Sequence, residues 1–346
     1  MVESGLSREH GPDALDLREL ETCPADPVLE LVKTCLGEGT LQRSPEVWNW
    51  KHRRNPFGKS IGRVAFEKDE AIGLRPFLRW QFRYGSKRIS AFRAVDTATH
   101  PRFRRQGLFR MMTLAGLSAL EESGGSLVFN TPNSRSGKGY LGMGWRALKR
   151  LEVLFRPCLG PQTLMRFSRR SGAAGRGKLG MSVQTLLEKA GLEGLLESWT
   201  ESWPGVQTDR HLEYLRWRFS EIPGLSYFAR FIETPQGDRS ALIGRREARL
   251  GLQGVRICEY LFDPDGDLGR ESCASRVLRE LARCDQVDYM VAMASRGTPE
   301  YSALRRSGFM PIPTRRRLMA LKLREGDDEQ LEPRGWRLTL GDLEVF

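Results

Sequence analysis

The sequence predicts an α/β protein of two similar halves, each a mixed, mostly antiparallel sheet flanked by helices. The chain has 346 residues, which is more than a typical single domain. Two short motifs also occur twice in the same order. VWNWKHRRNP at 47–56 aligns without gaps with YLRWRFSEIP at 214–223, and YLGMGW at 140–145 resembles ALRRSGF at 303–309. Nearly the same length of chain separates the motifs in each half, which favours a duplicated unit over chance.

The first half reads as an alternation of strands and helices. Ser44-Pro45 is a typical N-cap and first-turn pair, and the helix it begins should end before Pro56. Apolar residues at helical spacing predict an amphipathic helix from Gly107 to Ser123. The expected strands are 61–68, 71–83, 87–97, 126–130 and 151–155, with a further short helix near Tyr140.

The second half repeats this order and places Trp217 where the first half has Trp50. We expect strands near 225–233, 239–249, 255–263, 287–294 and 309–323, and helices at 272–284 and 299–306. SRRSGAAGRGKLG at 168–180 has no hydrophobic period and reads as a linker. The predicted organisation is therefore a first domain at 1–167, the linker at 168–180, a second domain at 181–323 and a tail at 324–346.

Composition limits the possible partners and cofactors. The net charge of +12 would suit nucleic acid, an anionic membrane surface or an anionic small molecule. The excess is mostly arginine spread along the chain, so we expect no nucleic-acid partner. Six scattered cysteines without CxxC spacing and only four histidines argue against a disulfide framework and against a metal site. No apolar stretch approaches the ~18 residues of a membrane span and no signal-peptide pattern is present, so we expect a soluble, cytoplasmic protein.

A basic loop follows the third predicted strand. RFRRQGLFR at 102–110 contains four arginines around one glycine and begins the helix at Gly107. Unpaired amides at a helix N-terminus, a glycine that permits close approach and flanking arginines together suit a pyrophosphate. The loop has neither the Gly-Lys-Ser/Thr ending of a Walker A loop nor a GxGxxG fingerprint. Its alternative interpretation is a solvated basic turn.

The residues after the next strand extend this pattern. NTPNSRSGKGYLGMGW supplies Asn133, Tyr140 and the pair Gly144-Trp145, and the basic loop supplies Arg104-x-x-Gly107. In this order and context the chain resembles the GCN5-related N-acetyltransferase (GNAT) family over about 12–160, with a more degenerate copy over about 180–323. The resemblance implies two tandem GNAT-like domains. Phe109 departs from the family pattern, which usually has Gly or Ala there.

The resemblance also implies a cofactor site for acetyl-CoA or another acyl-CoA. Backbone amides from about Gln106 to Arg110 would bind the pyrophosphate, the strand end at 95–97 would bind the pantetheine arm, and Asn133 would contact that arm from the other side. The implied cofactor-binding residues are Val95, Asp96, Thr97, Arg104, Arg105, Gln106, Gly107, Leu108, Phe109, Arg110 and Asn133.

Tyr140 would be the general acid, because expulsion of a thiolate requires a proton near the sulfur. Its alternative role is that of a buried tyrosine closing the short helix. The general base is less defined. His100 has a suitable ordinary pKa but also reads as a solvated loop residue, and Glu67 also reads as a solvent-facing strand residue.

The second copy lacks this chemistry. Leu304 stands in place of Tyr140, Gly297 in place of Asn133, and the acidic PDGDLGR at 264–270 in place of the basic loop. We therefore expect one acyl-CoA site, in the first domain, while the second domain shapes the acceptor site or braces the first. The acceptor would be a small-molecule or sugar amine. Two alternatives are a Fem-like aminoacyl transferase that uses charged tRNA and a non-catalytic acyl-CoA-binding module.

The tail, RGWRLTLGDLEVF at 334–346, alternates apolar and polar residues after a charged spacer. One interpretation is a strand added to a sheet edge. The other is that the tail folds over the acceptor cleft, where Asp342, Glu344 and the carboxylate of Phe346 would supply negative charge for a cationic amine.

Overall fold

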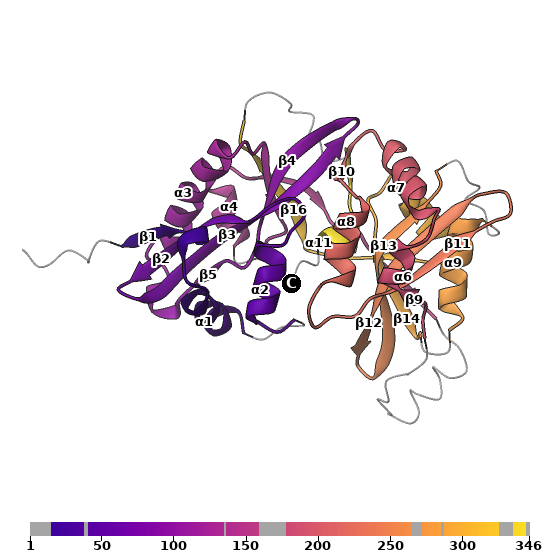
Figure 1. The fold of residues 1–346 in the computed structure, drawn as a ribbon, viewed down its shortest axis with the longest axis horizontal. Coiled ribbons are helices and arrows are strands. Elements are labelled where there is room, and N and C mark those ends of the chain that lie inside the picture. Colours follow the sequence, from indigo (N-terminus) through magenta and orange to yellow (C-terminus); the bar gives the residue numbers. More distant parts are fainter. Residues whose placement is uncertain are drawn as a thin grey trace, which may run out of the picture.

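The structure is a computed structural model that describes residues 15–37, 41–134, 136–158, 178–264, 272–284, 287–324 and 335–343. Most of the predicted linker lies outside these ranges. Figure 1 shows two lobes side by side, with the first half of the chain in one and most of the second half in the other. In the described part of the chain, no helix is both long and apolar enough to cross a bilayer.

The first half contains the predicted succession of strands and helices. Its elements are β1 (Asp16–Glu19), α1 (Ala25–Leu36), α2 (Pro45–His52), β2 (Ile61–Glu67), β3 (Glu70–Tyr84), β4 (Lys87–Ala94), β5 (Ala98–Thr99), α3 (Leu108–Glu122), β6 (Leu127–Asn130), α4 (Gly137–Leu141), β7 (Arg146–Arg150) and β8 (Val153–Pro157). Ser44 caps α2 as expected, because its side chain accepts a hydrogen bond from the amide of Val47. The predicted strand 87–97 ends early, at Ala94, because the chain bends over Val95 to Thr97 before β5.

The second half repeats this succession and adds the tail. Its elements are β9 (Met181–Ser182), α6 (Val183–Leu187), α7 (Leu192–Glu201), β10 (Val206–Thr208), α8 (Leu212–Leu215), β11 (Phe228–Glu233), β12 (Arg239–Arg249), β13 (Leu252–Phe262), α9 (Cys273–Ala282), β14 (Tyr289–Met293), α10 (Pro299–Arg306), β15 (Met310–Ile312), β16 (Arg317–Lys322), β17 (Trp336–Arg337) and α11 (Leu340–Leu343). The single strand expected at 309–323 is two strands, β15 and β16, which belong to different sheets.

The two sheets correspond strand by strand. The first has the order β1-β2-β3-β4-β6-β16-β7 and the second the order β9-β11-β12-β13-β14-β8-β15. In both, the neighbours are antiparallel except for one central parallel pair, β4 with β6 and β13 with β14. This correspondence confirms two GNAT-like sheets of mixed, mostly antiparallel strands, as the sequence predicted.

The halves exchange their closing strands. β8, from the first half, pairs with β14 and β15, whereas β16, from the second half, pairs with β6 and β7. The two sheets therefore do not coincide with the sequence ranges 1–167 and 181–323. Each sheet is completed by the last strand of the other half.

Equivalent tryptophans of the two halves meet at the centre of the molecule. Trp50 Nε1 donates to the carbonyl of Trp217 at 2.7 Å, and Trp217 Nε1 donates to the carbonyl of Trp50 at 2.8 Å. Their rings stack with centroids 5.1 Å apart. A reciprocal contact between equivalent residues is expected at a two-fold axis, so the duplicated halves are related like the subunits of a symmetric dimer.

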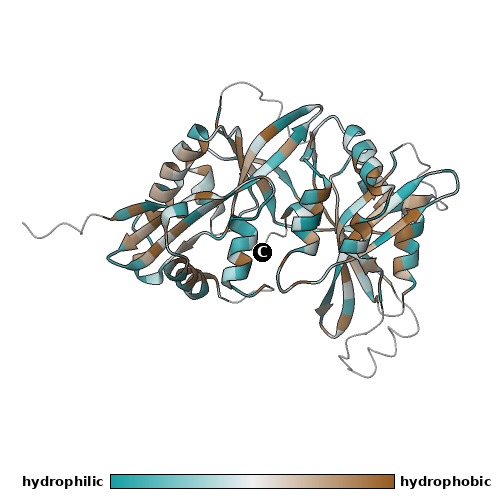
Figure 2. Ribbon diagram, viewed as in Figure 1, coloured by the Kyte–Doolittle hydropathy of each residue, from teal (hydrophilic) through white to brown (hydrophobic). Residues whose placement is uncertain are grey.

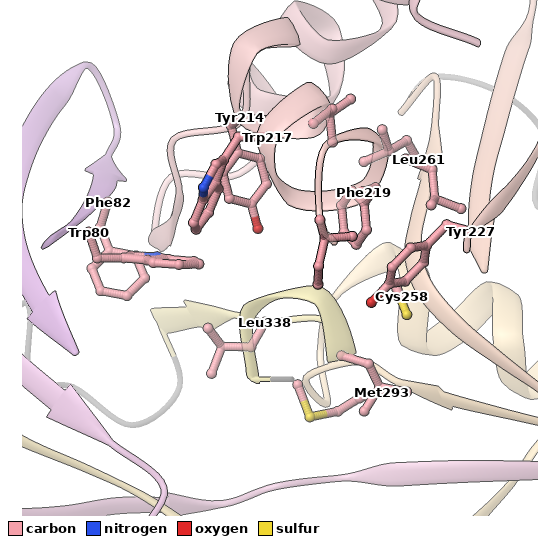
Figure 3. Packing of buried hydrophobic residues seen from close by; sticks show 14 of the residues in the cluster. Trp80, Phe82, Tyr214, Trp217, Phe219, Tyr227, Cys258, Leu261, Met293 and Leu338 are labelled. Carbon is pink, nitrogen blue, oxygen red and sulfur yellow. The ribbon is translucent and has the colours of Figure 1, made fainter. Parts of the chain in front are cut away.

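One hydrophobic core joins the two lobes. Figure 3 shows Trp80 and Phe82 of β3 packed near Tyr214 and Trp217 of the second half, with Leu338 of the tail close by. In Figure 2, hydrophobic and hydrophilic residues alternate along the strands of both lobes, as expected where one sheet face is more buried than the other. Helices α3 and α9 bury their apolar faces against the outer faces of the two sheets.

The described part of the tail adds to the first sheet. β17 pairs in parallel with β10, which pairs in turn with β3. The edge-strand interpretation is therefore correct for Trp336–Arg337, and α11 follows between the two lobes (Figure 1).

Candidate active site

Two parallel strands diverge at the centre of the first sheet. The ladder between β4 and β6 runs from Ala91↔Leu127 to Arg93↔Phe129, the last pair within the described residues. Beyond it, the chain bends at Asp96, whose φ of 39° lies in the left-handed region, and β5 then pairs with β3. Among the described residues, the ladder between β4 and β6 therefore does not continue into this bend.

The basic loop joins β5 to α3 as the sequence predicted. Gly107 has φ of 79° and immediately precedes the first helical residue, Leu108. The amide of Met111 donates to the carbonyl of Gly107. The amides of Leu108, Phe109 and Arg110 precede it and have no earlier helical carbonyl to pair with. Together with the helix dipole, these amides favour an anion at this position.

The polar side chains of the loop fold back on nearby backbone. Arg104 donates to the carbonyl of Thr99 at 3.3 Å, and Gln106 donates to the carbonyl of Arg102 at 3.3 Å. Arg110 donates to the carbonyl of Gly142 at 3.2 Å, which links the start of α3 to the end of α4. Arg110 therefore lies at the start of α3, whereas Arg104 is bonded back to β5.

Tyr140 lies on α4 with its side chain turned into the protein, and the residue is 4% exposed. Its ring contacts Phe109 of α3 edge-on, with centroids 5.4 Å apart, and Trp145 at 5.2 Å. Phe109, the residue that departs from the family pattern, thus packs against the predicted general acid. The Tyr140 hydroxyl accepts a hydrogen bond from Arg75 Nη1 at 2.8 Å.

Arg75, on β3, is the residue of this site that the sequence analysis missed. It is fully buried, and its Nη1 also donates to Thr97 Oγ1 at 2.5 Å. Its guanidinium lies 4.6 Å from the centroid of the Phe77 ring and 5.3 Å from that of Phe109. Within the described residues, its Nε and Nη2 have no hydrogen-bond partner. The sequence did contain a sign of this residue's role, because Arg75 is the one charged residue in the otherwise apolar stretch 71–78.

The pair has a chemical consequence. Arginine can only donate hydrogen bonds, so the Tyr140 oxygen is the acceptor toward Arg75. The phenolic hydrogen therefore remains available for another acceptor. A buried cation beside it also favours negative charge that develops nearby.

Asp96 has a different role from the one expected. Its carboxylate is turned toward α2, where it lies 2.6 Å from Lys51 Nζ and 3.1 Å from His52 Nε2. Arg43 Nη1 is 3.5 Å away. Burial alone would raise the pKa of Asp96, but the charge of Lys51 and the hydrogen bond from His52 hold that pKa well below its usual range. The side chain is thus an anchor between α2 and the bend in the sheet.

The other predicted site residues serve local structure. Val95 is buried, and its amide donates to the carbonyl of Pro76. Asn133 Oδ1 accepts hydrogen bonds from the amide and the hydroxyl of Ser136, at 3.0 and 3.2 Å. This turn directly precedes α4, which carries Tyr140. Asn133 therefore helps to position that helix.

Of the two candidate bases, Glu67 is the last residue of β2 and His100 directly follows β5. Glu67 Oε2 is 3.7 Å from Arg102 Nη2, and His100 Nε2 is 3.8 Å from Glu70 Oε1. The structure brings Glu67 and His100 close to the basic loop but gives both side chains partners other than Tyr140.

The equivalent positions of the second half are apolar or outside the described residues. Leu304 of α10 is buried in the core beneath α9. Gly297 lies in a left-handed turn with φ of 90°. Residues 265–270 of the acidic loop lie outside the described ranges. Leu304 therefore gives this half no acid at the position of Tyr140.

Asp342 of the tail is not available to bind a cationic amine. It is fully buried, and both of its carboxylate oxygens are 2.8 Å from Arg210 Nη2. It also accepts a hydrogen bond from the amide of Thr339 at 2.7 Å. The expectation for Asp342 is therefore corrected, because its charge is already neutralised. Glu344 and Phe346 lie outside the described residues.

A metal site would need several histidine, cysteine or carboxylate side chains in one place. Within the described ranges, no group of three or more such residues is arranged to hold a metal ion.

The comparisons with known proteins agree with this geometry. Residues 16–148 match the family model described as an acetyltransferase (GNAT) domain. The GCN5-related N-acetyltransferase from Anabaena variabilis superimposes with a TM-score of 0.64 at 12% identity, over 89% of this chain and 73% of that chain. Eis1 from Mycobacterium abscessus gives 0.57 at 14% identity, over 90% and 74%. Saccharomyces cerevisiae N-myristoyltransferase with bound myristoyl-CoA gives 0.54 at 12% identity, over 91% and 85%. No curated protein matches the sequence.

At these identities, the structural similarity establishes a shared fold over both halves of the chain. The match to the family model is more specific and covers the lobe that contains Tyr140 and the basic loop. Residues 16–148 are therefore a GNAT acetyltransferase domain.

Proposed function

We propose that the protein is an acyl-CoA-dependent N-acyltransferase that transfers an acyl group, most simply acetyl from acetyl-CoA, to the amine of a small molecule or sugar by direct attack. The observation that carries this proposal is the Tyr140–Arg75 pair. The pair joins α4 to β3, and both of its residues pack against Phe109 of α3.

The chain has groups that fit each part of an acyl-CoA. The unpaired amides at the start of α3, with Arg104, Arg105 and Arg110 around them, fit the pyrophosphate. The backbone at the bend from Val95 to Thr97 fits the amides of a pantetheine arm. The two Arg75 donors without partners add positive charge close to Tyr140.

The bound acyl-CoA would supply an activated acyl group and depart as a thiol. Attack by the amine on the thioester carbonyl forms the C–N bond, and the C–S bond then breaks. Tyr140 would donate its free hydrogen to the departing sulfur, while Arg75, which already donates to the same oxygen, would stabilise the resulting phenolate. The attacking amine loses one proton to solvent. Tyr140 then regains one proton from solvent, so the number of protons is unchanged over the reaction.

A test of the cofactor site is the substitution Gly107→Val. A Cβ at this position would meet nothing within 4 Å, so any effect comes from the left-handed φ that a β-branched residue avoids. The altered loop should bind acetyl-CoA at least tenfold more weakly, about 1.4 kcal/mol, as measured by calorimetry.

Gly85→Val is the matched control. Gly85 also has a positive φ and open space around it, but it lies in the β3–β4 turn. Both variants should lose a similar amount of folding stability, since both strain one residue, whereas only Gly107→Val should lose affinity. Equal acetyl-CoA affinity in the two folded variants would place the cofactor site elsewhere.

A further inference from the structure

A pocket of about 400 Å³ lies on the face of the second sheet opposite α9. Side chains alternate between the two faces of this sheet. Leu154, Val255 and Met290 belong to the core beneath α9, whereas their neighbours Phe155 and Tyr289 line the pocket. The volume is in the range of small-molecule sites. The pocket is lined by neither Tyr140 nor the basic loop.

The floor of the pocket is aromatic. Tyr289 on β14 lies over Gly254 on β13, where an added Cβ would come within 2.1 Å of the Tyr289 ring. The absence of a side chain at Gly254 therefore makes room for the ring, which stacks on Phe155 with centroids 5.6 Å apart.

Tyr289 also brings a buried donor to this floor. The residue is 6% exposed, and its hydroxyl makes no close hydrogen bond among the described residues, although the Glu247 carboxylate lies near enough to interact with it. Burial and the nearby charge of Glu247 raise the pKa of Tyr289 to about 12, so the hydroxyl keeps its proton. A buried donor of this kind fits a polar group on a ligand.

The charge of the pocket is positive. Glu247 forms an ion pair with Arg256, so the one acidic residue of the lining is neutralised. Arg249 and Arg316 also line the pocket, and neither forms an ion pair within the described part of the chain. A polycation would be repelled by this rim, whereas an anionic group would be attracted.

The pocket mouth is apolar. Leu250, at the tip of the β12–β13 hairpin, is 92% exposed, and Ile312 of β15 is 41% exposed. Both residues line the pocket. Exposed large apolar side chains beside a cavity are typical of a binding surface.

Helix α11 contacts both this pocket and the end of β4 in the first sheet. Leu340 and Leu343 of α11 form a wall of the pocket. The carbonyl of Leu343 accepts a hydrogen bond from Arg93 Nη2 at 2.5 Å, and Arg93 belongs to the last ladder pair of β4 with β6. Leu343 thus lines the pocket with its side chain and contacts the end of β4 through its carbonyl.

We propose that this pocket binds the acceptor, and that the acceptor is an amphipathic amine with an apolar body and a carboxylate. The apolar body would lie on Phe155 and Tyr289, and the carboxylate would meet Arg249 or Arg316. This inference rests on the proposed acyltransferase function and selects one class among its acceptors. Amino sugars, which have neither an apolar body nor a carboxylate, are the class of acceptors that this proposal excludes.

The test uses matched pairs that differ only in the carboxylate: leucine with isoamylamine, phenylalanine with phenethylamine, and tryptophan with tryptamine. Binding to the full chain saturated with acetyl-CoA is measured by calorimetry, with glucosamine as the amino sugar. At least one amino acid should bind more tightly than its decarboxylated partner by roughly fivefold, the effect of one favourable ion pair. Glucosamine should bind more weakly than that amino acid.

Variants connect this preference to the pocket. The double substitution Arg249→Ala with Arg316→Ala should abolish the difference within the pair, and Tyr289→Phe should weaken binding of the amino acid. Arg283→Ala removes an exposed arginine of the α9 side and should change nothing. Acetyl-CoA affinity, measured in parallel, should be the same in all variants.

The outcomes separate the two proposals. Suppose that acetyl-CoA binds but the two members of every pair bind with equal affinity, or that glucosamine binds most tightly, or that the double variant still prefers the amino acid. In each case the acceptor class is wrong while the proposed function stands. If acetyl-CoA does not bind but the preference is present, the pocket is real and the acyltransferase assignment of this site fails.

Discussion

At the scale of single residues, the main feature of the site is a buried cation that has no carboxylate partner among the residues the structure describes. Arg75 donates to Tyr140 and Thr97, is surrounded by aromatic rings and, among the described residues, has two donors left over. Burying an uncompensated charge is costly, so such a residue is poorly explained by stability alone. This favours a role in the reaction.

The substitution Arg75→Met tests that role. It replaces a buried charge with an apolar side chain of similar length, so the melting temperature should stay the same or rise. The turnover number should nevertheless fall at least ~tenfold, because Tyr140 loses the cation that supports proton donation. An acyl donor with selenium in place of the thioester sulfur should restore much of the rate, since a selenolate leaves without a proton.

A different result would assign Arg75 to the fold. A large drop in melting temperature, or an equal loss of rate with both donors, would show that it supports the structure rather than acting through Tyr140. Tyr140→Phe is the matched control. The fall in its turnover number should likewise be smaller with the selenium donor than with the thioester.

At the scale of elements, α2 is tied to the bend of the first sheet by buried titratable groups. His52 Nδ1 lies 2.9 Å from Ser60 Oγ, and His52 Nε2 lies 3.1 Å from Asp96 Oδ2. Lys51 of the same helix and Arg43 before it also face Asp96. Burial lowers the pKa of His52 more than the charge of Asp96 raises it.

This attachment should make folding stability depend on pH. Because the pKa of folded His52 lies below its ordinary value of 6.5, the unfolded chain binds a proton first as pH falls. The contribution of His52 is complete above about pH 6.5 and decreases below it. Denaturant unfolding should therefore show a free energy of unfolding that declines from about pH 7 to about pH 5.

His52→Gln should flatten this decline, since glutamine keeps hydrogen-bonding groups but does not titrate. Asp96 adds a second, separate window. Its lowered pKa contributes stability above about pH 4 that is lost only in stronger acid. An unchanged slope between pH 7 and pH 5 in His52→Gln would mean that other groups dominate.

At the scale of the whole molecule, the two lobes are one cooperative unit. The Trp50–Trp217 pair, the exchanged strands β8 and β16 and a continuous core all cross between the halves. The arrangement has the pattern of a domain-swapped dimer that became a single chain.

We therefore expect that residues 1–167 do not fold alone. Without β16, strands β6 and β7 would each lose a partner, and β8 would be an unpaired apolar edge. Fragments 1–167 and 178–346 expressed together should copurify and show one cooperative thermal transition. A monomeric, cooperatively folding 1–167 would contradict the expected dependence.

The local features of the site were readable from the sequence, because they depend on residues close together in the chain. The glycine of the basic loop, the cap at Ser44 and the helix that carries Tyr140 each follow from neighbouring residues and hydrophobic period. Duplication was readable for the same reason, since both copies keep their short motifs. The missed features are partnerships: Arg75 with Tyr140, and Asp96 with Lys51 and His52.

The sequence by itself therefore determined the kind of fold, its repetition and the positions of the basic loop and the predicted acid. Only the tertiary structure decided which half supplies the last strand of each sheet, and that α11 contacts both the pocket and the end of β4. Strand partners and buried ion pairs are chosen by the free energy of the whole packed assembly, in which residues far apart in sequence compete for the same surface. A local pattern records that a strand is apolar, but not which edge it completes.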